Sequence, residues 1–276
     1  MTFDKEDKDK EMNEPQAAVT HYQEELLRYD QEEFPEQWAT VQFNLGAAFL
    51  DLPSVPPEEN CLKAISCMEK SLTVFNAEES AEEYGVATQA LGGAYLEMSH
   101  EEPVTYLPLA QEAFEKALTV RAQDEYPFEW AEILNHLAII HTNIVTPEPE
   151  LHLKKAIECC ELALEVRTKE EVPDAWAQTQ KNLGSAWAAM ADDGSHTNLH
   201  NAIASYEEAL SVHTEEEFPF DWALLQGNLG DVYMKLGEYK TALTHYQNGL
   251  DEMNREEAED YIPDLERKLE SARSKV

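Results

Sequence analysis

The sequence has few basic residues, and this scarcity argues against one large class of function. Lys and Arg together number 20 against 56 Asp and Glu, so the formal net charge is −36 and the pI is near 4.4. Proteins that bind nucleic acid through its phosphates need a basic stripe on their surface. We therefore expect no nucleic-acid partner. The acidic side chains either form a solvated face or attract a basic partner.

The sequence also lacks a long apolar run. No stretch reaches the roughly 18 apolar residues that suggest a membrane-spanning helix. Residues 1–14 carry mixed charges and lack the apolar core of a secretory signal. The few cysteines have no metal-type spacing and are interpreted as small buried residues of a reducing compartment; they are Cys61, Cys67, Cys159 and Cys160. These features predict a cytoplasmic protein that does not enter a membrane.

What the sequence does contain is a fixed repeat. An aromatic residue recurs every 46 positions, at Trp38, Tyr84, Trp130, Trp176 and Trp222. Each opens a variant of one phrase, which in the fourth copy reads Trp-Ala-Gln-Thr-Gln-Lys-Asn-Leu-Gly. A fixed period of this length indicates stacked units that pack mainly on their neighbours, and it argues against a single globular core.

Each repeat contains two helical patterns. The first, helix A, begins near a proline three residues before the aromatic in four of the five copies, which suits the first turn of a helix. Helix A is predicted to run to about Asp51, Glu97, Asn143, Met190 and Leu236. The second, helix B, carries an apolar stripe with helical spacing, which in the fourth copy consists of Ala202, Tyr206, Ala209 and Leu210.

A small residue recurs at one position inside helix A. Glycine in a helix interior costs about 1 kcal/mol relative to alanine, so we expect it to mark a close contact between helices. The residues at this position are Gly46, Gly92, Ala138, Gly184 and Gly230.

The repeat also divides the chain. Residues 1–14 are highly charged and aperiodic and are predicted to be disordered. The rest is predicted to be all-α, with a leading helix at 15–33, units at 34–79, 80–125, 126–171, 172–217 and 218–254, and a polar capping helix at 255–276.

The last unit resembles a tetratricopeptide repeat, because the motif's spacing is found at Leu229, Gly230, Tyr233, Ala242, Tyr246 and Gly249. The four earlier units match with six extra residues between helices A and B, and the resemblance covers roughly residues 15–254. It implies a right-handed α-solenoid of antiparallel helix pairs, similar to bacterial multi-repeat proteins. Its concave groove is then expected to bind a protein or peptide. The family serves many functions, so the resemblance does not identify the partner.

The resemblance also implies which helix A positions line the groove. In this sequence they are Thr40, Phe43, Ala47, Leu50, Val86, Gln89, Leu96, Glu132, Asn135, Ile139, Gln178, Lys181, Ser185, Leu224, Asp231 and Met234. Only three of these are charged, which predicts a largely neutral ligand surface on an acidic protein. The alternative is that the long connections between helices A and B cover some of these side chains. Some family members clamp chaperone carboxylates with two cations, but here Lys181 has no second cation beside it, so no clamp is expected.

Two histidine patterns could indicate chemistry. His196 and His200 are four residues apart, the spacing of two metal ligands on one helical face. They are assigned to the connection between helices, with no third ligand in register, so we expect exposed histidines and neither a metal nor a cofactor. Glu132 and His136 are also four apart on one face of helix A and are the place where a once-only enzymatic or regulatory site would lie.

Acidic pairs such as Glu216 and Glu217 recur before helix A, and a feature that repeats along an array argues for structure. The sequence therefore predicts a non-enzymatic scaffold or adaptor that binds a protein or peptide through the groove. The alternative is a protein that binds a basic partner through its acidic outer surface.

Overall fold

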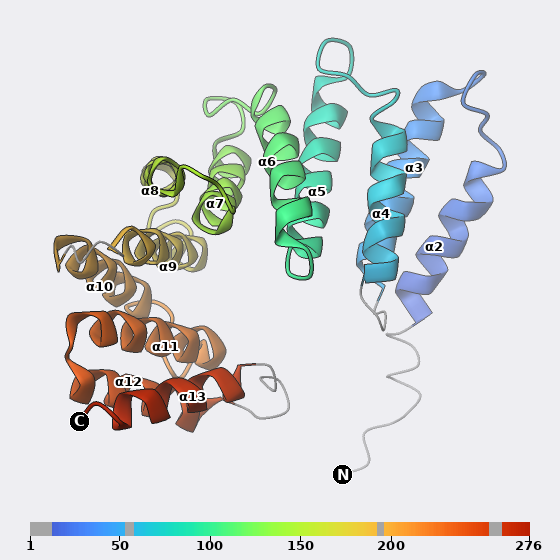
Figure 1. Cartoon of the computed structure of the whole chain (residues 1–276). Coiled ribbons are helices and arrows are strands. Elements are labelled where there is room, and N and C mark those ends of the chain that lie inside the picture. Colours follow the sequence, from blue (N-terminus) through green and yellow to red (C-terminus); the bar gives the residue numbers. More distant parts are fainter. Residues whose placement is uncertain (1–12, 53–57, 192–195, 254–260) are drawn as a thin grey trace. The chain divides into compact units, whose positions relative to one another are not determined.

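The computed structural model describes residues 13–52, 58–191, 196–253 and 261–276, and within these ranges every regular element is a helix (Figure 1). The helices are α2 (Asn13–Leu26), α3 (Pro35–Leu50), α4 (Glu58–Ser71), α5 (Ala81–Met98), α6 (Pro103–Leu118), α7 (Pro127–Asn143), α8 (Pro149–Val166), α9 (Pro173–Met190), α10 (His196–Leu210), α11 (Pro219–Leu236), α12 (Tyr239–Glu252) and α13 (Ile262–Arg273). The all-helical fold predicted from the repeat is confirmed. Residues 1–12, most of the segment predicted to be disordered, lie outside the described residues.

The five A helices begin at matching points of the sequence. Proline is the first residue of α3, α7, α9 and α11, and alanine is the first residue of α5. These first residues are 46 positions apart. The aromatic residue three positions later closes the first helical turn, as when the Trp38 amide donates to the Phe34 carbonyl at 2.9 Å. Proline fits this place because the amide it lacks has no partner in the first turn of a helix.

The helices divide between two compact units, one of residues 1–136 with 143–145 and one of residues 137–142 with 146–276. In the first unit, α3 packs on α4 and α5 packs on α6, while α2 lies against α3 and α4 against α5. In the second unit, α9 packs on α10 and α11 packs on α12, while α8 lies against α9 and α10 against α11. Neighbouring pairs therefore pack as in a tetratricopeptide-repeat solenoid.

The small residue of helix A lies where a large side chain of helix B crosses it. A Cβ placed on Gly184 would lie 2.6 Å from Cε1 of Tyr206, and a Cβ on Gly230 would lie 2.4 Å from Cε1 of Tyr246. The predicted close contacts at both glycines are confirmed. In the third copy, Ala138 takes the place of glycine, and the B helix carries the smaller Cys160 in the same buried cluster. In these three pairs, a large side chain on helix B thus goes with glycine on helix A, and a small one goes with alanine.

Helix α13 covers the apolar side of the last pair. Leu265, Leu269 and Ala272 join Ala242 and Tyr246 in one buried cluster. The opposite side of α13 is exposed and charged, as at Glu266, Arg267 and Glu270. A helix with a polar outer face shields the apolar side of the preceding pair and needs no further helix to cover it.

Candidate functional site

The predicted groove positions all lie on the A helices, and the structure leaves most of them accessible. All of them except Asn135 are exposed or half-buried. Leu50 and Val86 are the most exposed of the large apolar ones, at 42% and 37%. Asn135 is buried, so the prediction that its side chain lines an open surface is wrong. It lies among tightly packed residues of α7 such as Ile133 and Leu137.

Three of the predicted positions line one hollow of about 300 Å³ between α3 and α5. We call it the α3/α5 hollow, and its lining residues are Thr40, Phe43, Phe75, Glu82, Glu83 and Val86. Phe43, Phe75 and Val86 make it apolar. The Thr40 hydroxyl already donates to the Glu36 carbonyl at 2.9 Å, so it is used within its own helix. The hollow therefore has an apolar interior and two carboxylates.

Phe75 is the residue of this hollow that the groove positions did not include. It follows α4 in a turn closed by its amide, which donates to the Ser71 carbonyl at 3.0 Å. Its ring is buried against Ala39 and Ala87, and Phe43 packs against the same cluster. Phe75 thus packs against both A helices and adds an apolar wall to the space between them.

The residues at the same register in later copies are polar and buried. Arg121 stacks its guanidinium over the Tyr126 ring at 4.3 Å. Arg167 donates to Thr179 Oγ1 at 3.2 Å, and His213 Nε2 lies 2.8 Å from a carboxylate oxygen of Asp174. These positions are 46 residues apart, starting from Phe75. Phenylalanine at a position that is basic in the next three copies is the sequence feature that could have predicted an apolar hollow in the first pair.

The three charged residues of the predicted groove are each bonded to a neighbouring helix. Gln89 Nε2 on α5 donates to Glu132 Oε2 on α7 at 2.8 Å. Lys181 on α9 pairs with Asp221 on α11, with 2.8 Å between nitrogen and oxygen. These bonds link adjacent A helices side by side, so a partner at these points would have to replace existing contacts.

Asp231, the third charged groove residue, is held from two sides. Lys268 of α13 contacts one carboxylate oxygen at 2.8 Å, and the Tyr246 hydroxyl donates to the other at 2.7 Å. Burial alone would lower the pKa of Lys268, but its contacts with Asp231 and Asp264 raise that pKa above its ordinary value. Lys268 therefore stays charged, and Asp231 has a stable counter-ion inside the protein.

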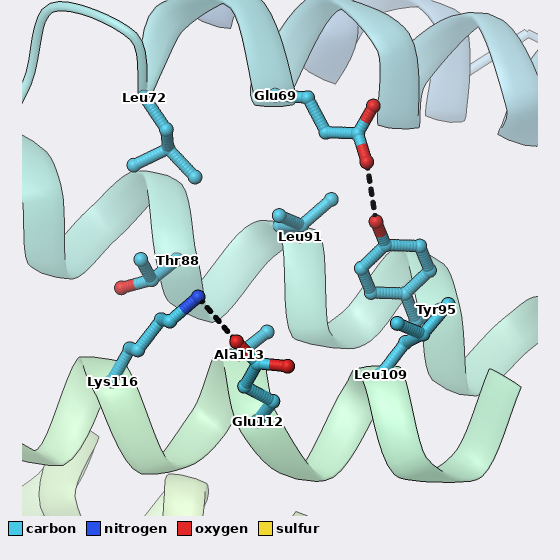
Figure 2. Close-up of a pocket in the computed structure, with 9 residues that line it drawn as sticks. All are labelled: Glu69, Leu72, Thr88, Leu91, Tyr95, Leu109, Glu112, Ala113 and Lys116. Carbon is cyan, nitrogen blue, oxygen red and sulfur yellow. Dashed lines mark hydrogen bonds and ion pairs between the residues drawn. The ribbon is translucent and has the colours of Figure 1, made fainter.

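A second hollow, of about 340 Å³, lies among α4, α5 and α6 (Figure 2). Its apolar lining comes from Leu72, Leu91, Leu109 and Ala113. Its polar groups are paired with one another: the Tyr95 hydroxyl donates to Glu69 at 2.6 Å, and Lys116 contacts Glu112 at 2.7 Å (Figure 2). None of the predicted groove residues takes part. The apolar stripe of helix B did not predict this second hollow, because the same pattern of apolar residues is expected where two helices simply pack together.

The alternative site on α7 separates into two unconnected contacts. Glu132 accepts the hydrogen bond from Gln89, and the His136 ring stacks on Phe114 with 4.9 Å between ring centroids. Neither contact holds the carboxylate against the imidazole as a catalytic pair would require. Glu132 thus links α7 to α5, and His136 packs against α6.

The two spaced histidines lie elsewhere than the sequence suggested. His196 and His200 belong to the first turns of α10, so their assignment to the connection between helices is wrong, and both are exposed. Helix α10 reaches back to His196 because Leu199 and Ala202 bury one face of its first turns. Over the described ranges, no three His, Cys, Asp or Glu residues lie where they could hold a metal ion. Nor does that part of the chain contain a helix long and apolar enough to cross a membrane.

Comparison with known proteins identifies one repeat and the fold. Residues 224–251 match the family model described as tetratricopeptide repeat. A search of curated proteins found no match. The chain is similar in structure to a chain of the APC/C hetero-tetramer Cut9–Hcn1, with a TM-score of 0.60 and 16% identity over 94% of this chain and 40% of that one. At this identity the likeness shows a shared fold.

A second solved structure is the TPR2AB-domain:pHSP90 complex of yeast Sti1. It has 18% identity over 96% of this chain and 97% of that one, with a TM-score of 0.33. A TM-score this low supports no argument about either the fold or the partner.

Proposed function

Because residues 224–251 match the tetratricopeptide-repeat model and the whole chain has the fold of such a protein, we propose that it is a non-enzymatic scaffold that binds a protein or peptide through its A helices. The observation that carries the proposal is the α3/α5 hollow. It lies at Thr40, Phe43 and Val86, where the resemblance to the family places ligand contacts, and it has an apolar interior.

The energetics of the hollow favour an apolar contact. Burying one large apolar side chain of a partner contributes roughly 1.5–3 kcal/mol. The charged groove residues Glu132, Lys181 and Asp231 are bonded to neighbouring helices and have little left to offer a ligand. Affinity at this surface should therefore come mainly from apolar burial, and it should depend only modestly on salt.

A library of random twelve-residue peptides displayed on phage tests the proposal without knowledge of the natural partner. Peptides selected on the whole chain are synthesised, and their binding to the parent protein and to Phe43→Glu is measured by fluorescence anisotropy. A carboxylate in the hollow must lose its hydration or keep the apolar side chain out. We expect Phe43→Glu to weaken binding at least tenfold.

Leu62→Glu is the matched control, because Leu62 is a 48% exposed apolar residue of α4 outside both hollows. It should bind the selected peptides as the parent does. Since Phe43 is half-buried, Val86→Glu provides a second variant at an already exposed position, and circular dichroism checks that each variant is folded. If no peptide is enriched, or if both groove variants bind as the parent does, the proposal is wrong. Groove variants that bind normally, together with a steep loss of affinity in salt, would indicate the acidic outer surface instead.

A further inference from the structure

We infer that the α3/α5 hollow selects a peptide in which a large apolar residue stands next to Lys or Arg. The inference rests on the proposed function and adds the chemistry of the partner. Two features of the hollow carry it: an apolar interior large enough for a side chain, and a pair of carboxylates without an ion pair or hydrogen bond to any residue that the structure describes.

The apolar part sets the size of what can enter. Its volume of about 300 Å³ is at the lower end of the range of about 300–1,000 Å³ found for small-molecule sites. Phe43 and Phe75 offer aromatic surface from α3 and from the turn after α4, and Val86 adds an aliphatic one from α5. The space suits one large side chain of a peptide better than an extended ligand.

The acidic part consists of Glu82 and Glu83 in the first turn of α5. Both side chains are exposed, and over the described residues neither carboxylate has an ion pair or hydrogen bond. Many other glutamates on the helices do have such a partner, as Glu59 has Lys63 and Glu112 has Lys116. Two adjacent unpaired carboxylates beside an apolar hollow are therefore free to bind a cation from outside.

The buried Arg121 contacts the backbone of Glu82 and not its carboxylate. It donates to the Glu82 carbonyl at 3.4 Å and stacks over the Tyr126 ring at 4.3 Å. The chain as a whole carries a formal charge of −36. That field attracts basic segments and repels acidic ones during encounter. Charge complementarity thus selects a basic neighbour for the apolar residue.

Three peptides made from one selected sequence test this inference. They keep the apolar residue and place Arg, Gln or Glu beside it, and their affinities are compared on the whole chain. Each exposed charge pair changes affinity by about 1.4- to 5-fold. With two carboxylates, the Arg peptide should bind about 2- to 25-fold tighter than the Gln peptide, and the Glu peptide should bind weakest. The double variant Glu82→Gln, Glu83→Gln should bind the Arg and Gln peptides equally.

The double variant Glu101→Gln, Glu102→Gln is the matched control. It removes the same charge from two exposed residues beyond the far end of α5, more than about 20 Å away along the helix. This exceeds the Debye length of about 10 Å at 0.1 M salt, so the preference for Arg should persist. If the parent binds the three peptides equally while Phe43→Glu abolishes binding, the charge inference fails and the proposed function stands. If Phe43→Glu binds all three as the parent does, both fail.

Discussion

The size match between Gly184 and Tyr206 can be measured by a double-mutant cycle. A Cβ on residue 184 would lie 2.6 Å from Cε1 and 2.7 Å from Cδ1 of Tyr206. Tyr206 is 2% exposed and its hydroxyl lies 3.1 Å from Ser185 Oγ, so moving the ring would disturb the buried residues around it and this contact. Gly184→Ala should therefore cost about 1–3 kcal/mol by overpacking, offset by about 1 kcal/mol of helix propensity.

Tyr206→Cys should cost about 3–5 kcal/mol on the scale of aromatic truncations, because it leaves a cavity and removes the contact with Ser185. In the double variant the alanine meets the smaller cysteine, a combination like that of Ala138 and Cys160, which share one buried cluster in the third pair. The overpacking then disappears while the gain in helix propensity remains. We expect the double variant to be more stable than the sum of the single changes by about 1–3 kcal/mol.

Urea unfolding followed by circular dichroism gives the four free energies of unfolding. The control cycle combines Gly184→Ala with Tyr246→Cys, since Tyr246 crosses Gly230 and not Gly184. Its two changes should add within about 0.5 kcal/mol. Equal coupling in the two cycles, or additivity in the first, would refute the size-matching argument.

Three further predictions concern titration, thiols and metals. Burial lowers the pKa of His141 from 6.5 to about 4, and the charges of His152 and Lys155 add to this effect. As the pH falls, His141 therefore takes up a proton in the unfolded chain at a higher pH than in the folded one. Stability should fall as the pH drops from about 6.5 to about 4. Urea midpoints across that range should show a smaller fall for His141→Gln. Burial also raises the pKa of Cys61 to about 11, so iodoacetamide at pH 8 should label it slowly until the chain is unfolded, as mass spectrometry can follow. EDTA should leave the melting temperature unchanged, and a fall of several degrees reversed by zinc would show that His196 and His200 belong to a metal site.

Features that repeat along the chain could be predicted from the sequence. The ends expected for helix A, such as Asn143, Met190 and Leu236, are found at those residues, because proline, glycine and the apolar stripe act locally and in every copy. The contacts at Gly184 and Gly230 followed from the cost of glycine in a helix. The same pattern occurs in five copies, so it predicts the ends and the close contacts of helix A more clearly than a single copy would.

Features that occur once were harder to predict. The α3/α5 hollow depends on Phe75, whereas the matching residues of the next three copies are basic. A prediction based on what the copies share does not detect a residue that differs in one of them. The bonds of Glu132, Lys181 and Asp231 depend on which side chains meet across two helices, and a motif confined to one helix does not specify that. Asn135 has the register of a groove residue, but its surroundings on α7 bury it.

The matching of small and large side chains has a consequence for how such an array can grow. The match lies between the two helices of one pair, as in Gly92 with Phe114 and Gly230 with Tyr246, and not between successive pairs. A gene duplication that copied a whole pair would carry its own packing solution into the longer chain. A recombination that joined the A helix of the third pair to the B helix of the fourth would set Ala138 against Tyr206 and overpack the new pair. We therefore expect such an array to lengthen by duplication of complete pairs, because a helix A from one pair does not pack well on a helix B from another.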